Sequence, residues 1–463
     1  MTRQEPTINR PGAAGRWVPL GLAGLGGGIA AFGLLADLLG IGQDPGFGAN
    51  QALLAVSGLA LLGVGLGLAT AAGRGLARRL VRSRIVLAGA GLVLGLFLVE
   101  AGLRTLQWIW FAEEGRGLAS LVPDPTLGVR LAPHVGGHDA RGFRNARVPD
   151  RAAIVAIGDS QTYGVGAQRS QAWPQALARR AGREVYNMGL GSYGPVQYWK
   201  LAEEALALDP QVILIGLYLG NDLYDAYQMA YQTPAYPDLR APEDAAILAR
   251  DTVGPVAQAY QDQRLGFHQA RSRWAKHVTL LQLLQRHRLW PSAVSFAEAR
   301  AWVRAYPDRG LVATAGPVRT VCTPAIRLLA LDLEEPRIAE GLRITETALA
   351  RTRETLAGGP RLLVLLIPTK ETVFADAAHQ GSEAVRETYA RLLALEARVR
   401  RRLMEGCAAR GIPCLDLGPA LQEALARGEQ VYAEDFDSHP AAGGYGVIAA
   451  VAQEALEGMD GVL

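Results

Sequence analysis

Hydrophobic and polar positions divide this chain into two parts of different character. The first 111 residues contain three long apolar runs with almost no charged residues. From Ala152 onward, short apolar runs of strand length alternate with stretches of helical periodicity. Apolar runs of about 20 residues are typical of membrane-spanning helices, whereas the alternation is typical of a parallel α/β sheet.

The three long runs predict an N-terminal transmembrane module over residues 1–111. They extend from Trp17 to Leu39, from Gln51 to Ala72 and from Ile85 to Leu103. A cleaved signal peptide does not fit, because three such runs occur and no small-residue cleavage site follows a short apolar stretch. We therefore expect three transmembrane helices at about 17–39, 51–72 and 85–106.

The arginines predict an orientation for this module. They gather in the N-terminal tail and in the loop 73–84, whereas the loop between the first two runs carries only Asp44. Because cytoplasmic loops are enriched in Lys and Arg, we expect a multi-pass protein of the cytoplasmic membrane. Its remaining residues would then lie on the periplasmic or extracellular side.

The rest of the chain predicts a lead-in segment, 112–150, and an α/β domain, 151–463. The alternation is broken from about 230 to 337, which we interpret as an insertion; insertions at this edge of a sheet often form lids or substrate walls. The expected strands are 152–157, 184–187, 211–218, 361–367 and 413–417. The expected helices are 170–182, 195–207, 338–357, 383–409, 418–427 and 443–457.

Composition narrows the class of function. A length of 463 residues favours two or three units, and a net charge of +3 gives no indication of nucleic-acid binding. Three cysteines occur at spacings that fit no metal site. We expect buried thiols, with a Cys407–Cys414 disulfide as the alternative in an oxidising compartment. The sequence has no phosphate loop, metal-ligand cluster or nucleotide fingerprint, so no cofactor is expected.

The segment Gly158-Asp159-Ser160 carries the first sign of chemistry. It ends the first expected strand, and a Gly-rich turn follows it. The carboxyl edge of an open parallel sheet is where such proteins place their chemistry, so Ser160 is a candidate nucleophile. Three further segments follow strands or lie near the C-terminus: 187–194, 220–222 and 435–440.

Ester cleavage at a serine needs a base, an acid that orients the base, and donors for the oxyanion. His439 is the best base among the seven histidines, because Asp437 and Asp435 stand two and four residues before it. Either carboxylate can orient the imidazole. Backbone N–H groups of the Gly-rich loop 187–194 and the side-chain amide of Asn221 are candidate oxyanion donors.

These four segments, in this order, resemble the four blocks of the SGNH (GDSL) hydrolase superfamily. The resemblance covers the α/β domain without its insertion, and it does not cover the membrane module. It implies a flavodoxin-like three-layer α/β/α fold with a five-stranded parallel sheet. It also implies Ser160 as nucleophile, His439 as base, and oxyanion donors from the Ser160 N–H, the second loop and Asn221.

The sequence departs from the family pattern in three places. The family's acid usually stands three residues before the histidine, where this chain has Phe436; Asp437, at minus two, resembles the arrangement in alginate O-acetyltransferase-like relatives. We prefer Asp437 over Asp435 as the acid. The family's oxyanion glycine falls on Ser192, with Gly191 beside it. In the third block, 220–222, no residue separates the glycine from the asparagine as in the family's Gly-x-Asn-Asp. Asn221 is therefore the only residue of this block that we match to the family.

Several polar residues near these blocks have structural interpretations. We expect Asp159 and Asp222 to bond loop amides. Lys370 follows the fourth strand, and it suits an anionic substrate or equally a surface or helix-start position. The run Arg141–Asn145 precedes the first strand, and we expect it to pack near the catalytic edge.

The leading hypothesis is a membrane-anchored serine esterase that acts through an acyl-serine. From its expected location, the substrate would be an O-acyl or O-acetyl ester on a cell-envelope glycan or a similar molecule. The alternative is an O-acetyltransferase that passes the acyl group to a polysaccharide hydroxyl. A second alternative is a non-catalytic envelope scaffold. The expected partners are the ester substrate and the membrane, and no nucleic acid.

Overall fold

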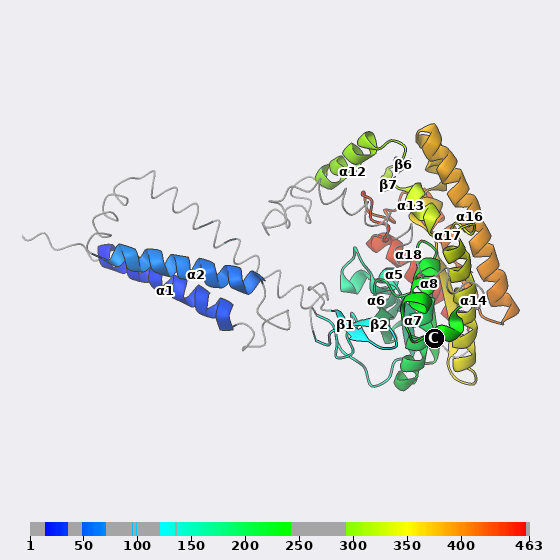
Figure 1. Cartoon of the computed structure of the whole chain (residues 1–463), viewed down its shortest axis with the longest axis horizontal. Coiled ribbons are helices and arrows are strands. Elements are labelled where there is room, and N and C mark those ends of the chain that lie inside the picture. The colour runs from blue at the N-terminus through cyan, green and yellow to red at the C-terminus, as the bar shows by residue number, and fades with distance from the viewer. Residues whose placement is uncertain are drawn as a thin grey trace, which may run out of the picture. The chain divides into compact units, whose positions relative to one another are not determined.

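The computed structural model describes residues 14–35, 49–70, 121–134, 137–241 and 293–459, together with Gly95 and Val99. The chain divides into two compact units. The first contains helices α1 (Ala14–Leu35) and α2 (Ala49–Ala69), and the second contains the elements from β1 onward (Figure 1).

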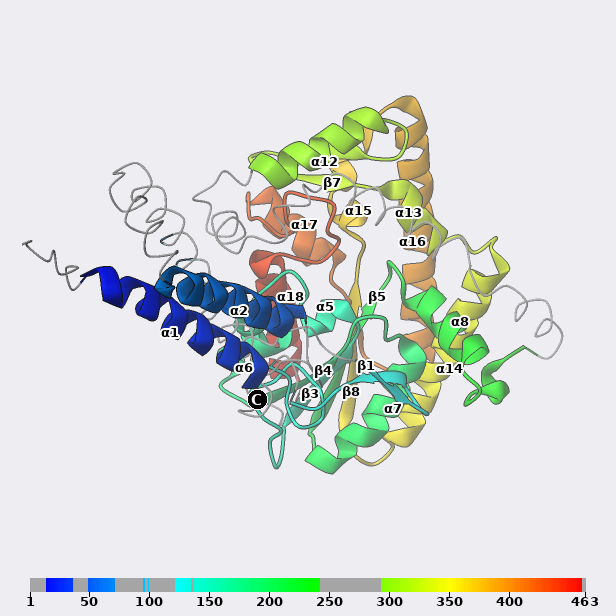
Figure 2. The ribbon, with the colours of Figure 1, turned by 60° about the vertical axis from the view of Figure 1, so that its left-hand side comes forward.

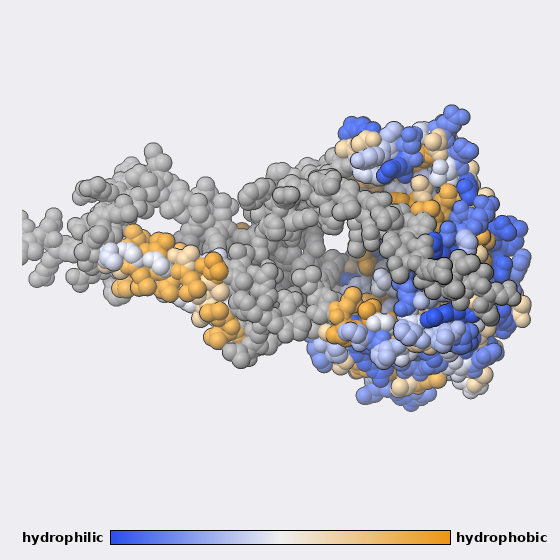
Figure 3. All heavy atoms as spheres, viewed as in Figure 1, coloured by the Kyte–Doolittle hydropathy of each residue, from blue (hydrophilic) through white to orange (hydrophobic). Residues whose placement is uncertain are grey.

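Helices α1 and α2 pack against each other through glycines. A Cβ atom at Gly26 would lie 2.3 Å from the backbone nitrogen of Leu62, and one at Gly58 would lie 2.3 Å from that of Ala30. Such distances leave no room for a side chain, so the two backbones approach closely along this face. Large apolar side chains elsewhere on the two helices, such as Phe32 and Val56, are exposed (Figure 3).

The prediction of a three-helix transmembrane module is wrong for the residues that the structure describes, because none of their helices combines the length and apolar character needed to cross a membrane. The third expected helix, 85–106, lies outside the described residues except for Gly95 and Val99.

Three further predictions depended on that module and are corrected with it. They are the multi-pass localisation in the cytoplasmic membrane, the periplasmic or extracellular side for the remaining residues, and the membrane as an integral partner.

The second unit is built on the five-stranded sheet that the apolar runs predicted. Its spatial order is β4-β3-β5-β8-β9, and each neighbouring pair is parallel. The strands are β3 (Ile154–Gly158), β4 (Val185–Gly189), β5 (Val212–Tyr218), β8 (Arg361–Ile367) and β9 (Cys414–Asp416). Strands β3, β4 and β5 are buried along their whole length, which explains why they read as continuous apolar runs and not as alternating ones.

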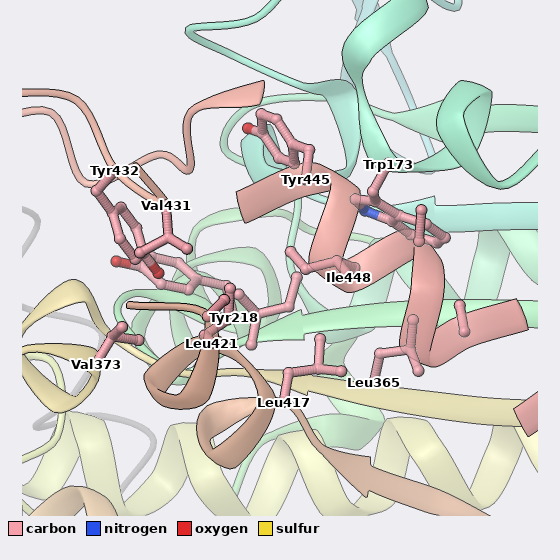
Figure 4. Close-up of a cluster of buried hydrophobic side chains, with 14 of the residues drawn as sticks. Trp173, Tyr218, Leu365, Val373, Leu417, Leu421, Val431, Tyr432, Tyr445 and Ile448 are labelled. Atoms are coloured by element: carbon pink, nitrogen blue, oxygen red, sulfur yellow. The ribbon is translucent and has the colours of Figure 1, made fainter. Parts of the chain in front are cut away.

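Helices cover both faces of this sheet, as Figure 2 shows. One group consists of α6 (Trp173–Ala181), α17 (Gly418–Ala426) and α18 (Ala442–Glu457), and the other of α7 (Pro195–Ala205), α14 (Pro336–Thr355) and α16 (Glu383–Ala409). Side chains of the first group meet alternate strand residues in a buried cluster that includes Trp173, Leu421, Ile448 and Leu365 (Figure 4). The three-layer α/β/α arrangement therefore follows from burying both faces of a parallel sheet.

The sequence pattern did not predict several shorter elements. Helix α8 (Asp222–Gln232) follows β5 directly, and β1 (Leu121–Asp124) pairs antiparallel with β2 (Gly128–Leu131). The described end of the expected insertion contains α12 (Ala293–Ala305), an antiparallel hairpin of β6 (Leu311–Ala315) and β7 (Val318–Cys322), and α13 (Pro324–Leu329). Short helices α5 (Ser160–Tyr163) and α15 (Lys370–Val373) begin just after β3 and β8.

Gly341 of α14 allows that helix to touch α8, and its replacement should destabilise the second unit. A Cβ atom there would lie 1.8 Å from the carbonyl oxygen of Leu223. We expect Gly341→Ala to lower the free energy of unfolding by about 1–3 kcal/mol. The matched control is Gly446→Ala in α18, where no atom lies within 4 Å of the new Cβ; it should raise stability by up to about 1 kcal/mol. Urea unfolding followed by circular dichroism checks this, and equal midpoints for the two variants would contradict it.

Candidate active site

The first three predicted blocks meet at one edge of the sheet because their strands are neighbours. Gly158, the last residue of β3, pairs in register with Gly189 of β4 and with Gly216 of β5. Gly158 leaves no room for a side chain, since a Cβ atom would lie 2.1 Å from Oγ1 of Thr162 and 2.8 Å from the Gly216 carbonyl oxygen. The chain can therefore turn sharply from β3 into α5.

Ser160 is the first residue of helix α5, at the carboxyl end of β3. Asp159 caps this helix, and its Oδ1 accepts a hydrogen bond from the Gln161 N–H at 2.8 Å. Gly164, with φ of +86°, ends the helix in the left-handed region that favours glycine. The serine thus lies on a short helix whose two ends are fixed by local residues.

His439 connects Ser160 to a carboxylate. Its Nε2 lies 2.8 Å from Ser160 Oγ, and its Nδ1 lies 2.5 Å from Asp437 Oδ1. The same carboxylate oxygen accepts the His439 backbone N–H at 3.1 Å. A carboxylate at Nδ1 favours the tautomer in which Nδ1 carries the proton, which leaves Nε2 able to accept the serine proton.

Asp437, and not Asp435, is the carboxylate that the structure places on the imidazole. Burial raises the pKa of Asp437, but the hydrogen bonds and charge of His439 and the charge of Lys370 outweigh it and lower the pKa to about 2. Asp437 is therefore ionised at neutral pH. The side chain of Asp435 has a different role, because its Oδ1 accepts the Asp437 backbone N–H at 2.7 Å. Phe436, where the family pattern has its acid, is buried.

Of the candidate oxyanion donors, the Gly-rich loop lies closest to Ser160 in the contacts of the described residues. A Cβ atom at Gly191 would lie 3.7 Å from the Ser160 Cβ, so this loop passes directly beside the nucleophile. Ser192 has φ of +68°, the left-handed region in which non-glycine residues are strained. Asn221 is the N-cap residue of α8, and its amide Nδ2 donates to Oδ2 of Asp225 at 2.6 Å.

Three carboxyl groups lie near this edge of the sheet: Asp159 and Asp222 are buried, and Asp225 is partly exposed. Burial raises the pKa of Asp159 to about 6, although hydrogen bonds from Gln161 and the charge of His439 oppose it. Burial and the nearby charge of Asp159 raise the pKa of Asp225 to about 8. Burial also raises the pKa of Asp222 well above its usual range. Asp225 is therefore mainly protonated at neutral pH.

Asp159 and Asp222 both bond loop amides, as expected from the sequence. Asp222 accepts hydrogen bonds from the Tyr218 backbone N–H at 2.9 Å and from the Tyr198 hydroxyl at 3.0 Å. These contacts tie the start of α8 to the end of β5. Asp159 additionally accepts the Ser160 hydroxyl at 3.2 Å.

Arg144 supports the nucleophile loop in a way that the sequence did not reveal. Its guanidinium is buried and donates to the carbonyl oxygens of Gly164 at 2.7 Å and Ala167 at 3.0 Å. Asn145 bridges to the second block, because its amide donates to the Asn187 carbonyl at 2.9 Å. The run Arg141–Asn145 therefore joins two catalytic loops. Its mixture of arginine, asparagine, glycine and phenylalanine in a loop was the only sign of this in the sequence.

Lys370 is buried at the start of α15, in agreement with the helix-start interpretation and not with a surface position. Its ammonium donates to the backbone carbonyls of Asp435 and Asp437 at 2.9 and 3.0 Å.

Among the described residues, no group of three or more His, Cys, Asp or Glu side chains is arranged to hold a metal ion. Cys322, Cys407 and Cys414 are free thiols.

Comparisons with known proteins find structural matches only. No protein-family model and no curated protein matches the sequence. A lipolytic protein of the G-D-S-L family from Veillonella parvula matches with 12% identity and a TM-score of 0.31 over 66% of this chain and 97% of that chain. A putative lipolytic protein of the same family from Desulfitobacterium hafniense matches with 14% identity and a TM-score of 0.28, over 65% and 98%.

A GDSL-like lipase from Bacteroides thetaiotaomicron also matches, with 12% identity and a TM-score of 0.25, over 66% of this chain and 87% of that chain. The resemblance to SGNH (GDSL) hydrolases stays a prediction from the sequence blocks. It agrees with the sheet order and with the position of Ser160 at the end of β3.

The two candidate acids should differ sharply on substitution. We expect Asp437→Asn to lower kcat/KM by about 10³- to 10⁴-fold, because an amide no longer holds His439 in the tautomer that accepts the serine proton. Asp435→Asn should cost less than about tenfold, since its amide oxygen can still accept the Asp437 N–H. Steady-state hydrolysis of p-nitrophenyl acetate measures both. Equal losses would contradict the assignment of Asp437.

The partly exposed carboxyl of Asp225 should make stability depend on pH. Its folded pKa of about 8 lies above the unfolded value of about 4, so its stabilising effect is complete below pH 4 and is lost as the pH rises toward 8. Asp225→Asn keeps an acceptor for Asn221 and removes the titration. We expect the variant to unfold at least about 2 °C above the unmodified chain at pH 8, and to differ little from it at pH 4.

Thermal unfolding at several pH values checks this effect. The control is Asp150→Asn, at an exposed carboxyl, which should leave the pH profile unchanged. A difference between Asp225→Asn and the unmodified chain that is the same at pH 4 and pH 8 would rule out the titration of Asp225.

Proposed function

We propose that the α/β domain hydrolyses carboxylic esters through an acyl-enzyme intermediate on Ser160. The observation that carries this proposal is the continuous chain of hydrogen bonds from Ser160 Oγ through His439 to Asp437, at the carboxyl edge of the sheet. A hydroxyl, an imidazole and an ionised carboxylate in this order form the arrangement that activates serine for acyl transfer.

Each step of the reaction uses an atom already in place. His439 Nε2 takes the proton from Ser160 Oγ as the oxygen forms a bond to the ester carbonyl carbon. Asp437 stabilises the imidazolium that results. The imidazolium then gives its proton to the departing alkoxide, and the ester C–O bond breaks. In the second half, His439 takes a proton from water and the hydroxide attacks the acyl carbon. The bond from this carbon to Ser160 Oγ then breaks, and His439 returns the proton to Ser160 Oγ.

The developing oxyanion needs preorganised donors. The donors we propose for it are the Ser160 N–H at the start of α5, the backbone N–H groups of Gly191 and Ser192, and the amide of Asn221. Loss of one such donor typically raises the barrier by about 2.7–4 kcal/mol.

The class of acceptor is the point on which two candidate functions differ. Acyl transfer to a sugar hydroxyl uses the same acyl-serine, and the position of Asp437 two residues before His439 favours this second candidate through its resemblance to alginate O-acetyltransferase-like relatives. An envelope glycan as substrate was inferred from the membrane location, and it loses that support with the corrected location. A non-catalytic scaffold would not need an assembled Ser160, His439 and Asp437.

The test is hydrolysis of p-nitrophenyl acetate by the full chain and by Ser160→Ala. We expect Ser160-dependent release of p-nitrophenol, with a loss of at least about 10³-fold in the variant. Mass spectrometry of the intact protein during turnover should show an acetyl adduct on the unmodified chain only. A matched control is Ser170→Ala, which removes a serine hydroxyl from the 3-10 helix 169–171 near the same loop.

Addition of an oligosaccharide acceptor separates the two reactions. If the acetyl group appears mainly as free acetate, the result supports hydrolysis. If acetylated oligosaccharide exceeds free acetate, the result supports transfer. Activity that Ser160→Ala leaves unchanged would refute both functions.

A further inference from the structure

Lys370 is a charged side chain in the interior of the second unit. It is 1% exposed, and a lysine ammonium in the interior needs partners for its three N–H donors to offset the loss of hydration. Its Nζ has three acceptors: the backbone carbonyl of Asp435 at 2.9 Å, that of Asp437 at 3.0 Å, and Thr320 Oγ1 at 3.3 Å. Two of these belong to the loop that carries Asp437 and His439.

The backbone on either side of Lys370 is fixed to other elements. Thr369 donates through its backbone N–H and its hydroxyl to the buried carboxylate of Glu396 in α16. The carboxylate of Glu371 accepts the Thr323 backbone N–H at 2.8 Å. Lys370 therefore extends from a rigid point between α16 and the insertion, and it can fix whatever its ammonium binds.

The third partner, Thr320, belongs to the β6–β7 hairpin of the expected insertion. Its hydroxyl donates to the carbonyls of Ala433 at 2.7 Å and Asp435 at 3.1 Å, and the neighbouring Val321 N–H donates to Asp435 O at 3.2 Å. The carbonyl of Asp435 thus receives donors from both Lys370 and the hairpin. This part of the insertion therefore contacts the loop that carries Asp437 and His439.

Apolar contacts hold the same loop from the insertion side. The ring of Phe436 packs edge-on against Trp302 of α12, with ring centroids 4.9 Å apart. Phe436 also shares a small buried cluster with Val321 and Ala299. The residue between Asp435 and Asp437 is therefore anchored to the insertion, while the carbonyls on both sides of it turn toward Lys370.

We propose that Lys370 is a positioning residue for the acid–base pair: together with Thr320 it holds the loop 435–439 where Asp437 and His439 reach Ser160. This inference rests on the proposed function and deepens it. The ammonium donates to the two loop carbonyls and to Thr320, so it acts on the acid and the base through the loop backbone. The sequence led us to expect a lid or substrate wall in the insertion. Its described part contacts the loop that carries His439.

A double-mutant cycle in the full chain tests this role. Lys370→Met keeps the length of the side chain and removes its donors. We expect kcat for p-nitrophenyl acetate to fall about 10²-fold, the effect of a misplacement near 1 Å, with KM changed less than about threefold. In a His439→Ala background the same substitution should change the remaining activity less than about threefold, because the residue through which Lys370 acts is gone.

A merely structural role predicts a different pattern. Loss of folded protein would lower activity by the same factor in both backgrounds, and that result would overturn the proposal. Unchanged kcat in Lys370→Met would overturn it as well. Lys200→Met is the lysine control, on helix α7 and paired with Glu203, and it should leave kcat unchanged.

A gentler pair of variants covers the case in which Lys370→Met does not fold. Thr320→Val removes the hydroxyl that bonds the loop, and it should lower kcat by about 2- to 10-fold, the equivalent of one hydrogen bond. Thr314→Val removes a hydroxyl from the same hairpin that bonds Gln380 instead, and it should have no effect. Equal kcat for the two threonine variants would refute the coupling.

One measurement does not depend on ester hydrolysis. The Nδ1 proton of His439, in its short bond to Asp437, should give a far-downfield proton NMR signal in the unmodified chain and in Lys200→Met, and this signal should be lost or broadened in Lys370→Met. If the signal persists, Lys370 does not position the pair. If the unmodified chain shows no Ser160-dependent activity but the signal changes as expected, the proposed function fails and the positioning role stands.

Discussion

The hydrogen bond between His439 Nε2 and Ser160 Oγ is the contact on which the candidate site depends. It joins residues 279 positions apart, so it forms only when the sheet, the last helix and the intervening insertion are all in place. Closing a loop of that length has an entropic cost, and one hydrogen bond of about 1 kcal/mol cannot offset it. The contact is therefore a consequence of the fold around it, and its precision depends on how firmly each loop is held.

The two loops are held by different kinds of contact. The nucleophile loop is fixed by Arg144, whose fork of N–H donors binds the carbonyls of Gly164 and Ala167. The acid–base loop is bound by Lys370, whose ammonium binds the carbonyls of Asp435 and Asp437. In both cases a buried cation donates to backbone carbonyls of the loop that it holds.

Much of this arrangement could be predicted from the sequence because parallel strands are buried on both faces. Their continuous apolar runs gave bounds close to those of β3, β5 and β8. The candidate residues Ser160 and Asn221 follow directly after β3 and β5. The choice of Asp437 over Asp435 agrees with the contact to His439. The support contacts could not be predicted, since Arg144 and Lys370 bind backbone carbonyls, and carbonyls leave no residue pattern.

The chemistry of Lys370 explains why the loop is held by a cation on carbonyls and not by an ordinary ion pair. A lysine that bound the Asp437 carboxylate directly would compete with His439 for the same oxygens and weaken the orientation of the imidazole. By binding the carbonyl of Asp437 instead, the ammonium fixes the backbone and leaves Oδ1 to His439. Its charge still acts on the carboxylate through space, since it lowers the pKa of Asp437. One buried cation can thus order the loop without entering the reaction, and its charge adds to the larger effect of His439 on the pKa of Asp437.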